Sequence, residues 1–526
     1  MKTRNLFLSL FAFAAICACN KEVVPTVQDT LDGDAYIAVN IVTSDDAFTK
    51  ASDGDYVSGT ESPVAENAVN TINFLFFQDG TLVKKSTPAF TNWSGPDNAD
   101  PNPNIEKMSE AVVVLDKNDP LPNQLLVILN ASDYANGLTV GTTTLAQVLA
   151  KYDDYSDPKT NGFIMTNSVY ATDATGAVVN NVTKINPAEH LKATEAAAKA
   201  SPVKVYVERV NSKVVVKKGA SYVDHQNFEV DGNPITLRHK VLGFAVTPEI
   251  NKSYLVKNIT GITNGNDDDN ATGYWNGWTD KTNFRSYWAV NPVLVDEDVE
   301  INATATFTDA DNNYTAVWEA TDSDYADYVY YPQENVSQTA NPKLIVVAQI
   351  QKEVTAGNWE AYTAYSYAGK WYTESNLLSM AQNALLAAGH GFSSSDLKIV
   401  AAGAPAKDYE VKIRFVYEEG KSDDAKDVLV NLGNAKKWED GKCYFFVDIE
   451  HFGTHDGNLL KGFVRNHQYE ITINSISGWG TPGDLGIGGG DPEDPIIPEE
   501  PEDESYVAAT INILKWKVVS QEVDLK

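Results

Sequence analysis

The residues that could do chemistry most directly are clusters of oxygen donors, which suit a calcium ion. Asp309–Asn313 opens like a calcium-binding loop, but Tyr314 stands where glycine is needed and Ala320 where the closing glutamate should be. Asn264–Asn270 contains three consecutive aspartates. A solvated loop is the simpler interpretation of that segment, so the sequence predicts no cofactor and leaves calcium binding at Asn264–Asn270 undecided.

Histidine and cysteine provide no convincing zinc site or catalytic nucleophile. The seven histidines are scattered, and none belongs to an H-E-x-x-H arrangement. His451 and His455 are four residues apart, but Phe452-Gly453 between them disfavours a helix. Cys443 lies in a predicted strand, where a small buried hydrophobe is expected. Because a phosphate-binding glycine loop is also missing, the residues favour a protein that is not an enzyme.

The elements that must position these residues are mostly short strands. Tyr36–Val42 alternates, with Ile37, Val39 and Ile41 on one face. Leu125–Leu129 is wholly apolar and predicts a central strand. Two pairs of strands are expected as hairpins, Thr71–Phe77 with Thr81–Val83 and Val203–Val207 with Lys213–Lys217. Further strands are predicted at Val241–Val246, Lys343–Ile350, Glu410–Tyr417, Lys442–Ile449 and Gln468–Ile473, and helices at Thr143–Tyr152, Thr194–Ala200 and Glu374–Gly389.

This pattern predicts a mainly β protein with two antiparallel β-sandwich domains of transthyretin-like or immunoglobulin-like type and minor helices. A boundary is expected near residues 200–202, where an alanine-rich helix ends. The predicted parts are a signal peptide (1–19), an N-terminal sandwich that ends at residue 200, a C-terminal sandwich (201–483), a linker (484–504) and a terminal strand (505–526).

The N-terminus predicts export. Lys2 and Arg4 precede the uncharged apolar stretch Leu6–Ala18, which is too short to span a membrane and has the layout of a secretion signal. Ile16-Cys17-Ala18-Cys19 resembles a bacterial lipobox with Cys19 as the lipidated residue. An ordinary signal peptide with incidental cysteines is the alternative.

Composition agrees with a secreted protein. The three cysteines are Cys17, Cys19 and Cys443, so a disulfide framework is excluded in the mature chain. The formal net charge is −31 over 526 residues. Such an acidic chain argues against nucleic acid as a partner, because a phosphate backbone demands clustered Lys and Arg.

The C-terminus combines a spacer with an apolar strand. Asp491–Glu504 is acidic and rich in proline, which favours an extended spacer. Ser505–Lys526 follows, and its β-branched and aromatic residues predict a strand with two register slips. The anchoring side chains expected there are Val507, Ile511, Ile513, Leu514, Trp516, Val518, Val523 and Leu525. An exposed strand of this kind is an aggregation hazard unless it has a binding place.

Several stretches carry a family resemblance along nearly the whole chain. The most specific are Gly441-Lys-Cys-Tyr-Phe-Phe-Val447, Gly462-Phe-Val-Arg-Asn-His-Gln-Tyr-Glu-Ile-Thr-Ile-Asn474 and Gly478-Trp-Gly-Thr-Pro-Gly483. Supporting stretches are Ile72–Gly80, Val205–Val216, Ser253–Lys257 and Tyr330–Asn335. In these the chain resembles the Bacteroidales fimbrillins (type V pilins), specifically major structural subunits of the short, or minor, fimbria.

The resemblance implies a route to polymerisation. Family members are exported as lipoproteins and then cut after a basic residue, which here matches Lys50, before Ala51. The resemblance therefore implies a propeptide (20–50) that includes the first strand, and an N-terminal sandwich of residues 51–200. Better-known members have arginine at this position, so lysine leaves the protease in doubt, and Lys50 as one exposed lysine among many is the alternative. Cleavage would remove Asp34–Val42 and open a groove, which Ser505–Lys526 of the next subunit would fill as a donor strand.

The expected partners are therefore other copies of the chain in a head-to-tail homopolymer, anchor and accessory fimbrial subunits, a maturing surface protease and the outer membrane through lipid. Three alternatives remain, namely an accessory or tip fimbrial subunit, a glycan-binding surface lipoprotein and an extracellular hydrolase. Against the hydrolase, the sequence has no convincing nucleophile, metal site or group of carboxylates. For the second, the aromatic residues that could stack on sugars are Tyr274, Trp275, Trp278, Tyr287 and Trp288, although core packing explains them more simply.

Overall fold

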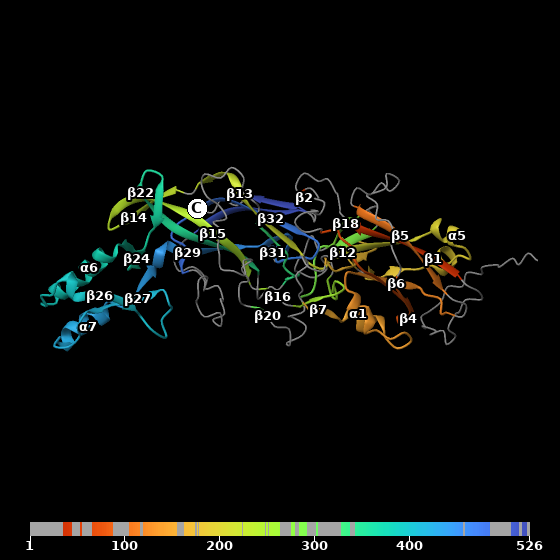
Figure 1. Ribbon diagram of the computed structural model, residues 1–526, viewed down its shortest axis with the longest axis horizontal. Coiled ribbons are helices and arrows are strands. Elements are labelled where there is room, and N and C mark those ends of the chain that lie inside the picture. The colour runs from red at the N-terminus through yellow and green to blue at the C-terminus, as the bar shows by residue number, and fades with distance from the viewer. Residues whose placement is uncertain are drawn as a thin grey trace, which may run out of the picture.

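The computed structural model shows an elongated molecule made of several β-sheets (Figure 1). The residues that it describes are 35–44, 53–54, 66–87, 105–115, 119–154, 162–173, 176, 178–223, 225–247, 249–250, 252–262, 275–278, 283–291, 301–302, 328–336, 342–455, 458–483, 506–514 and 518–522. The predicted mainly β fold is confirmed, with few helices.

One end of the molecule is built on an eight-stranded sheet with the order β4-β3-β6-β8-β12-β1-β5, and β11 pairs with β6 beside this path. The strands are β1 (Ala35–Ser44), β3 (Ile72–Gln78), β4 (Thr81–Ser86), β5 (Ile105–Leu115), β6 (Gln124–Leu129), β8 (Met165–Asn167), β11 (Thr183–Lys184) and β12 (Val203–Arg209). Small helices border it, namely α1 (Ser132–Asn136), α2 (Leu145–Leu149), α4 (Pro187–His190) and α5 (Glu195–Lys199).

The centre of this sheet is buried on both faces. Leu125 and Val127 belong to one apolar core, whereas Leu126 and Ile128 belong to another on the opposite face. This explains the continuous apolar run of β6, because successive side chains of a strand point to opposite faces. The predicted hairpin of β3 and β4 is confirmed, with Asp79 and Gly80 at φ 47° and 80° in the two-residue turn.

The middle of the molecule is a β-sandwich. One layer has the order β2-β35-β34-β32-β13-β21 and the other β14-β15-β22-β29-β33, with β23 beside β22. Their bounds are β2 (Asp53–Gly54), β13 (Lys213–Val223), β14 (His225–Val230), β15 (Asn233–Thr247), β21 (Tyr328–Tyr330), β22 (Lys343–Thr355), β23 (Asn358–Ala361), β29 (Lys442–Asp448), β32 (Gln468–Ser477), β33 (Thr481–Pro482), β34 (Tyr506–Leu514) and β35 (Val518–Glu522). Both layers contribute to one core, in which Val214 and Ile471 meet Phe244, Val346 and Phe445.

Short strands lie between these two bodies. They are β7 (Tyr152–Asp154), β9 (Tyr170–Ala171), β10 (Val179–Asn180), β16 (Glu249–Ile250), β17 (Lys252–Tyr254), β18 (Trp275–Trp278), β19 (Asn283–Ser286), β20 (Ile301–Asn302), β30 (Glu450–His455) and β31 (Asn458–Lys461). β17 pairs with β7, so the chain after residue 252 joins back to the N-terminal body.

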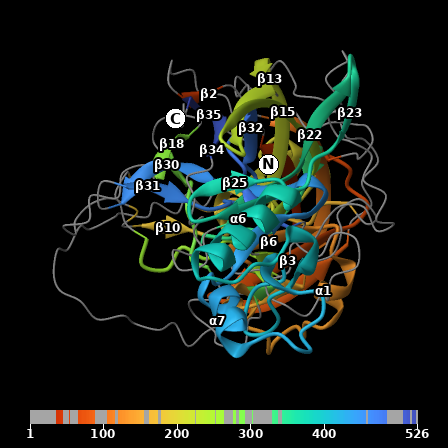
Figure 2. The ribbon, with the colours of Figure 1, turned by 90° about the vertical axis from the view of Figure 1, so that its left-hand side faces the viewer.

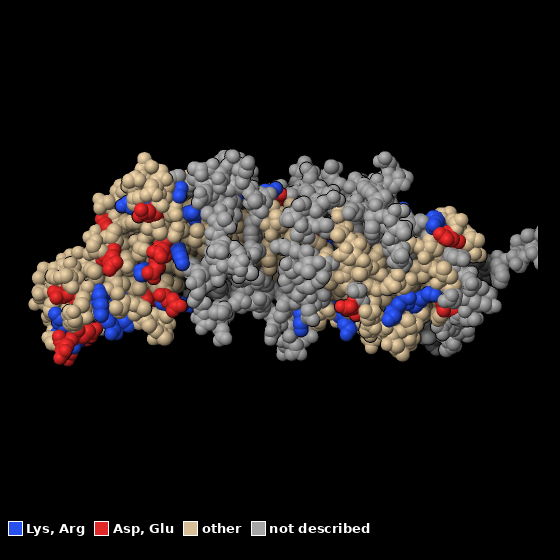
Figure 3. Space-filling view, viewed as in Figure 1, with Lys and Arg blue, Asp and Glu red and all other residues tan. Residues whose placement is uncertain are grey.

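A small α/β unit, which the sequence did not predict, forms the other end of the molecule. Its sheet has the order β25-β24-β28-β27-β26, made of β24 (Ala364–Tyr367), β25 (Lys370–Tyr372), β26 (Leu397–Ala401), β27 (Glu410–Phe415) and β28 (Ala435–Trp438). Helices α6 (Glu374–Ala387) and α7 (Asp423–Asn431) cover one face, and Figure 2 shows both in front in the end-on view. Figure 3 shows acidic side chains gathered at this end, where the first turn of α7 contains Asp423 and Asp424.

Tryptophans join this unit to the sandwich. Trp371 stacks on Trp479 with ring centroids 3.8 Å apart and planes 11° from parallel. The indole Nε1 of Trp438 donates a hydrogen bond of 2.9 Å to the carbonyl of Trp479. Such buried aromatic contacts fix one body firmly on the other.

One predicted hairpin is wrong. β12 and β13 are not paired, because β12 lies in the eight-stranded sheet and β13 in the sandwich, between β32 and β21. The segment 210–212 is therefore a crossing between two bodies. None of the helices in the described ranges is long and apolar enough to cross a membrane.

Candidate functional site

The first strand occupies an interior position in its sheet. β1 runs parallel to β12, with Val39 opposite Val203 and Ile41 opposite Val205, and antiparallel to β5, with Ile37 opposite Val113. Ile37 is fully buried in the core that β3, β6, β12 and β5 share. β1 is therefore a structural member of the N-terminal core.

The two strands beside β1 differ in how much of their backbone pairing β1 supplies. β12 also pairs with β8, so it keeps a ladder on its other side. Among the described strands, β5 pairs with β1 alone, and its register with β1 runs from Ala35 opposite Leu115 to Ser44 opposite Ile105. Loss of β1 would leave the backbone N–H and C=O groups of β5 without their ladder partners.

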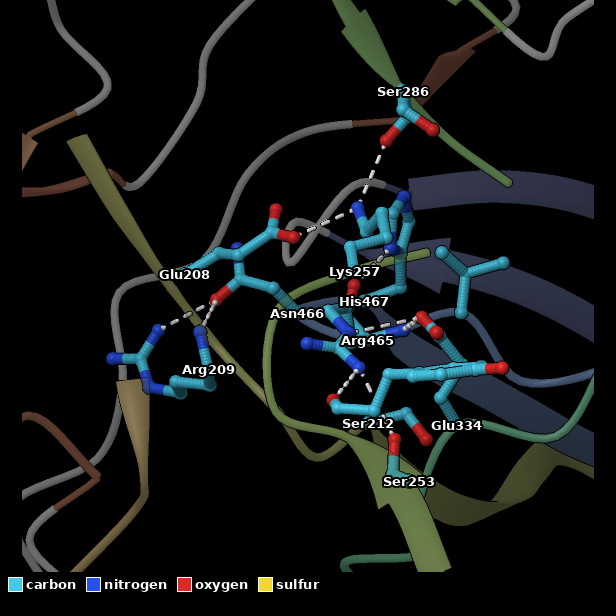
Figure 4. Close-up of polar contacts among 12 residues, drawn as sticks. Glu208, Arg209, Ser212, Ser253, Lys257, Ser286, Glu334, Arg465, Asn466 and His467 are labelled. Carbon is cyan, nitrogen blue, oxygen red and sulfur yellow. Dashed lines mark hydrogen bonds and ion pairs between the residues drawn. The ribbon is translucent and has the colours of Figure 1, made fainter. Parts of the chain in front are cut away.

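A buried ion cluster holds the far end of β12 (Figure 4). The Glu208 carboxylate lies 2.9 Å from Lys257 Nζ and 2.7 Å from Arg285 Nη2, and it accepts a hydrogen bond of 3.2 Å from the Ser168 hydroxyl. Lys257 also donates to the carbonyl of Ser286 at 3.0 Å. The three charged side chains are almost entirely buried, so their mutual compensation is what makes the burial tolerable.

The ionisation of this cluster follows from burial and opposite charges. Burial raises the pKa of the Glu208 carboxyl, but the positive charges of Lys257, Arg285 and Arg465 outweigh that effect, and the pKa lies below its usual value. Burial lowers the pKa of the Lys257 ammonium, and the charge of Glu208 opposes this shift. Glu208 is thus held as a carboxylate.

A second buried group is centred on Arg465. Its Nε lies 3.2 Å from Glu334 Oε2, while its Nη1 donates to the carbonyl of Leu255 at 3.0 Å and its Nη2 to the Ser253 hydroxyl at 3.1 Å. The carboxylate of Glu334 also accepts a hydrogen bond of 2.9 Å from the backbone N–H of Arg465. One guanidinium therefore fastens the chain before β32 to the segment that begins at β17.

The third group involves the residues on either side of the crossing between β12 and β13. Arg209 donates from Nη1 to Asn466 Oδ1 at 3.3 Å and from Nε to the carbonyl of Glu66 at 2.9 Å. Lys213 Nζ lies 2.7 Å from Glu66 Oε1, which also accepts a hydrogen bond of 2.6 Å from the Tyr331 hydroxyl. Glu66 is fully buried. This group ties the entry to β3 to both bodies.

Four of the seven stretches that carried the family resemblance meet in these three groups, and residues 462–474 supply Arg465 and Asn466. Residues 205–216 supply Glu208 and Arg209, residues 253–257 supply Ser253 and Lys257, and residues 330–335 supply Glu334. Sequence reasoning picked out the stretches but did not predict the ion cluster. A local signal for the cluster was the charged pair Glu208-Arg209. The pair directly follows the alternating valines of a strand, at positions where buried apolar residues are expected.

The C-terminal strand lies against its own chain. β34 pairs antiparallel with β32, with Ile511 opposite Ile471 and Ile513 opposite Tyr469. β35 folds back on β34 and also pairs with β2, where Val519 is opposite Asp53. Residues 53–54 and residues 518–522 are thus neighbours in one sheet.

The predicted site residues are only partly within this picture. Val507, Ile511, Ile513 and Leu514 lie in β34, and Val518 lies in β35. The lipidation and cleavage residues and three of the anchoring residues lie outside the described residues, as do both candidate calcium segments: Cys19, Lys50, Ala51, Trp516, Val523, Leu525, 264–270 and 309–313.

Other predicted residues have structural places. Cys443 is buried in β29, and burial raises the pKa of its thiol, which confirms the expectation of a small buried hydrophobe. His451 is buried, with Nε2 2.8 Å from the carbonyl of Tyr287. Tyr287 and Trp288 are core residues. Within the described ranges, His, Cys, Asp and Glu form no group that could hold a metal ion.

One protein family matches the C-terminal part of the chain. Residues 436–522 match the family described as major fimbrial subunit protein type IV, Fimbrillin, C-terminal. This match supports a Bacteroidales fimbrillin. It spans β28 to β35 and therefore includes Arg465 and the C-terminal strand that pairs with β32. The match supports a fimbrial subunit role at the cell surface. No curated protein matches the chain.

Solved structures give distant likenesses. A proposed cell adhesion protein from Bacteroides eggerthii is 11% identical, with a TM-score of 0.36 over 95% of this chain and 100% of that chain. The tip fimbrial protein Mfa3 from Porphyromonas gingivalis, with a C-terminal truncation, is 10% identical, with a TM-score of 0.34 over 92% and 100%. A fimbrial assembly protein from Parabacteroides distasonis is 12% identical, with a TM-score of 0.28 over 60% and 96%. Likenesses at this level carry no argument about function.

Proposed function

We propose that the chain is a shaft subunit of a cell-surface fimbria and polymerises by strand exchange after proteolysis. The observation that carries the proposal is the interior position of β1 between β12 and β5. β1 is the first described element of the chain, so one cut after it separates it from the described remainder.

A cut after Lys50 then creates an acceptor site. Departure of β1 exposes the ladder groups of β5 and one edge of β12, and it empties the place of Ile37 in the core. Filling that place with an aliphatic side chain recovers about 1.5–3 kcal/mol of burial. The exposed edges recover their hydrogen bonds when another strand adds between them.

The donor is the C-terminal segment 505–526 of the next subunit. The acidic, proline-rich segment before it gives the reach that a strand needs to leave its own body. Because donor and acceptor lie on different parts of each copy, the contact is heterologous and propagates into an open fibre. The division into a signal peptide (1–19), a propeptide (20–50), an N-terminal part (51–200), a C-terminal part (201–483), a linker (484–504) and a donor (505–526) is part of this proposal.

Export and anchoring complete the proposal. Lipid on Cys19 holds the precursor at the outer membrane until a surface protease cuts after Lys50, and anchor and accessory subunits start or end the fibre, which supports adhesion. An accessory or tip subunit is the second candidate. Against a glycan-binding lipoprotein, Tyr287 and Trp288 are 1% and 6% exposed and are unavailable for sugar stacking.

Deletion of residues 505–526 tests the donor. We expect a secreted, folded monomer and no fibres by electron microscopy, because the acceptor site stays empty. Normal fibres from the deletion variant would show that the donor lies elsewhere. Label at fibre ends alone, rather than along the shaft, would favour the accessory subunit.

Lys50→Ala tests the cut. The expected product is a longer precursor that stays with the membrane and does not polymerise. Lys370→Ala is the matched control, since Lys370 is an exposed lysine in the α/β unit, and it should leave fibres unchanged. N-terminal sequencing of mature subunits that start at another residue would overturn the assignment of Lys50.

A further inference from the structure

The order of residues in β1 is repeated in β34. Residues 36–41 read Tyr-Ile-Ala-Val-Asn-Ile, and residues 506–511 read Tyr-Val-Ala-Ala-Thr-Ile. Tyrosine, the following aliphatic residue, alanine and the final isoleucine recur at the same spacing. The two strands lie in different sheets at opposite ends of the chain, so common packing against one surface of the monomer does not explain the likeness.

We propose, on the basis of the strand exchange proposed above, that β34 of a second copy replaces β1 in one register and one direction. Tyr506 takes the place of Tyr36, and Leu514 takes the place of Ser44. Val507 then occupies the buried position of Ile37, and Ile511 takes the place of Ile41. The nine residues of β34 fill the ten-residue span of β1 from its second residue to its last.

Alternate positions of β34 are opposite buried apolar residues in both places. In its own chain, positions 507, 509, 511 and 513 are opposite Ile476, Ile473, Ile471 and Tyr469, all of which are buried. In the place of β1, positions 507 and 509 are opposite Val113 and Ala111 of β5, and positions 509, 511 and 513 are opposite Val203, Val205 and Val207 of β12, all of which are buried. On the β5 side, positions 511 and 513 are opposite Ser109 and Lys107. Each of the four positions thus has at least one buried apolar partner in both places. A slip by one residue would turn these positions to the opposite face.

A slip by two residues keeps the face but packs worse. It would align Asn512-Ile513 with Asn40-Ile41, which is also a sequence match. However, it would place Ala509 in the position of Ile37, which is fully buried, and Lys515 in the position of Thr43, opposite the buried Val207. An alanine leaves a cavity and a lysine a desolvated charge, so the register without the slip is favoured.

The direction follows from the lengths of the two ladders. β1 is antiparallel to β5 over the register from Ala35 to Ser44 but parallel to β12 only from Val39 to Thr43. A donor in the direction of β1 keeps the longer ladder antiparallel, which is the more stable arrangement per residue. A reversed donor would make the longer ladder parallel.

Cysteine pairs in full-length chains made by the producing cells test the register. Val112 is opposite Ala38 in β5, so we expect Val112→Cys to form disulfides with Ala508→Cys. Directly opposite strand positions have Cβ atoms about 4.5–5.5 Å apart, whereas diagonal neighbours are roughly 7–8 Å apart, too far for a disulfide. The readout is a ladder of cross-linked subunits from sheared fibres on a non-reducing gel. Cys443 is buried and its thiol pKa is raised, so it stays out of the reaction.

Each comparison variant corresponds to another arrangement. Thr510→Cys with Val112→Cys reports the two-residue slip, and Asn512→Cys with Val112→Cys reports the reversed strand. Cross-linked subunits with Ala508→Cys, and few with Thr510→Cys or Asn512→Cys, support the register. Cross-linked subunits with Thr510→Cys or Asn512→Cys in place of Ala508→Cys overturn the proposed register or direction and leave strand exchange intact. Fibres with no cross-linked subunits in any of the three overturn the register, and if chains that lack residues 505–526 also form fibres, strand exchange itself is overturned. Each cysteine alone is the control, and Lys50→Ala added to the 508 pair should abolish the ladder because β1 then stays in place.

Discussion

Ile37 and Val113 are direct partners across the β1–β5 ladder, and both are buried in the N-terminal core at 0% and 4% exposure. In the proposed function Ile37 leaves with the propeptide while Val113 stays. One core therefore has two successive occupants at the same position, the first from its own chain and the second from a neighbour. The stability of the precursor and that of the fibre then depend on different residues.

Ile37→Ala should weaken the precursor but not the fibre. Truncation of a buried isoleucine costs about 2–5 kcal/mol, so the midpoint of denaturant unfolding should fall for a precursor trapped by Lys50→Ala. Fibres assembled from the Ile37→Ala chain should resist denaturant as the parent does, because position 37 is no longer present. Ile350→Ala is the matched control in the sandwich core, and it should weaken both. Equal weakening of the fibre by Ile37→Ala would show that β1 remains.

Much of the fold could be predicted from strand periodicity. The alternation of Ile37, Val39 and Ile41 gave β1, and the apolar run of β6 gave a central strand because both of its faces are covered. Helix α6 follows the predicted range closely. Helix α7 was missed although Ser422 caps it and accepts a hydrogen bond from the N–H of Ala425. Its short length and many acidic residues hid it among turn-like residues.

The candidate site was less predictable, since it depends on long-range contacts. Glu208 meets Lys257 and Arg285, which are distant in sequence, and no local pattern encodes that meeting. The same reason explains the wrong hairpin. Residues 210–212 have the turn residues Asn211 and Ser212, but Asn466 binds Arg209 on one side of the turn and residues from β32 pair with β13 on the other. Tertiary contacts therefore overrode the local hairpin signal.

Acid should weaken the sandwich through His239. Burial lowers the pKa of His239 to about 4, while the hydrogen bond that its Nε2–H donates to the carbonyl of Gly478 opposes the shift. The folded form thus binds the proton less readily than the unfolded chain. Above about pH 6.5 the histidine is neutral in both states, and the unfolding free energy has its full value. As the pH falls from there to about 4, the unfolded chain binds the proton and the folded chain does not, so the unfolding free energy decreases by about 3 kcal/mol.

His239→Gln removes this titration and should flatten the dependence of unfolding free energy on pH in that window. Gln retains a donor for the carbonyl of Gly478. His390→Gln, the same substitution at a partly exposed histidine, serves as the control. An unchanged slope in His239→Gln would show that other groups produce the acid sensitivity.

Gly441 should tolerate alanine far less well than Gly357. Both glycines have positive φ, 68° and 79°, so a side chain at either costs about 1–2 kcal/mol in backbone conformation. A Cβ at 441 would also lie 2.2 Å from the carbonyl oxygen of Ile350, whereas a Cβ at 357 has no atom within 4 Å. We expect Gly441→Ala to lower the unfolding free energy by clearly more than Gly357→Ala. An equal decrease in unfolding free energy for the two variants would show that β22 and β29 can move apart with no loss of stability.

Glu208→Gln should be among the most damaging conservative changes in the chain. The substitution keeps the shape of the side chain but leaves Lys257 and Arg285 buried without their counter-charge, for which a loss of about 3–5 kcal/mol is expected in chemical unfolding. Glu195→Gln is the matched control. Its pair with Lys199 is about half exposed, so it should change stability by less than about 1 kcal/mol.

The cluster also predicts how these variants respond to acid and to a second change. The pKa of Glu208 is below its usual value in the folded chain, so the ionised carboxylate stabilises the folded state above the pKa that Glu208 has in the unfolded chain. That stabilisation is lost as the pH falls through the pKa of Glu208 in the folded chain. Glu208→Gln should therefore lose less stability on acidification than the parent. Lys257→Met added to Glu208→Gln should recover part of the loss, because it removes one uncompensated charge. If the double variant is weaker by the sum of the two single losses, the side chains act independently and the ion pair does not hold β12 beside the place of β1.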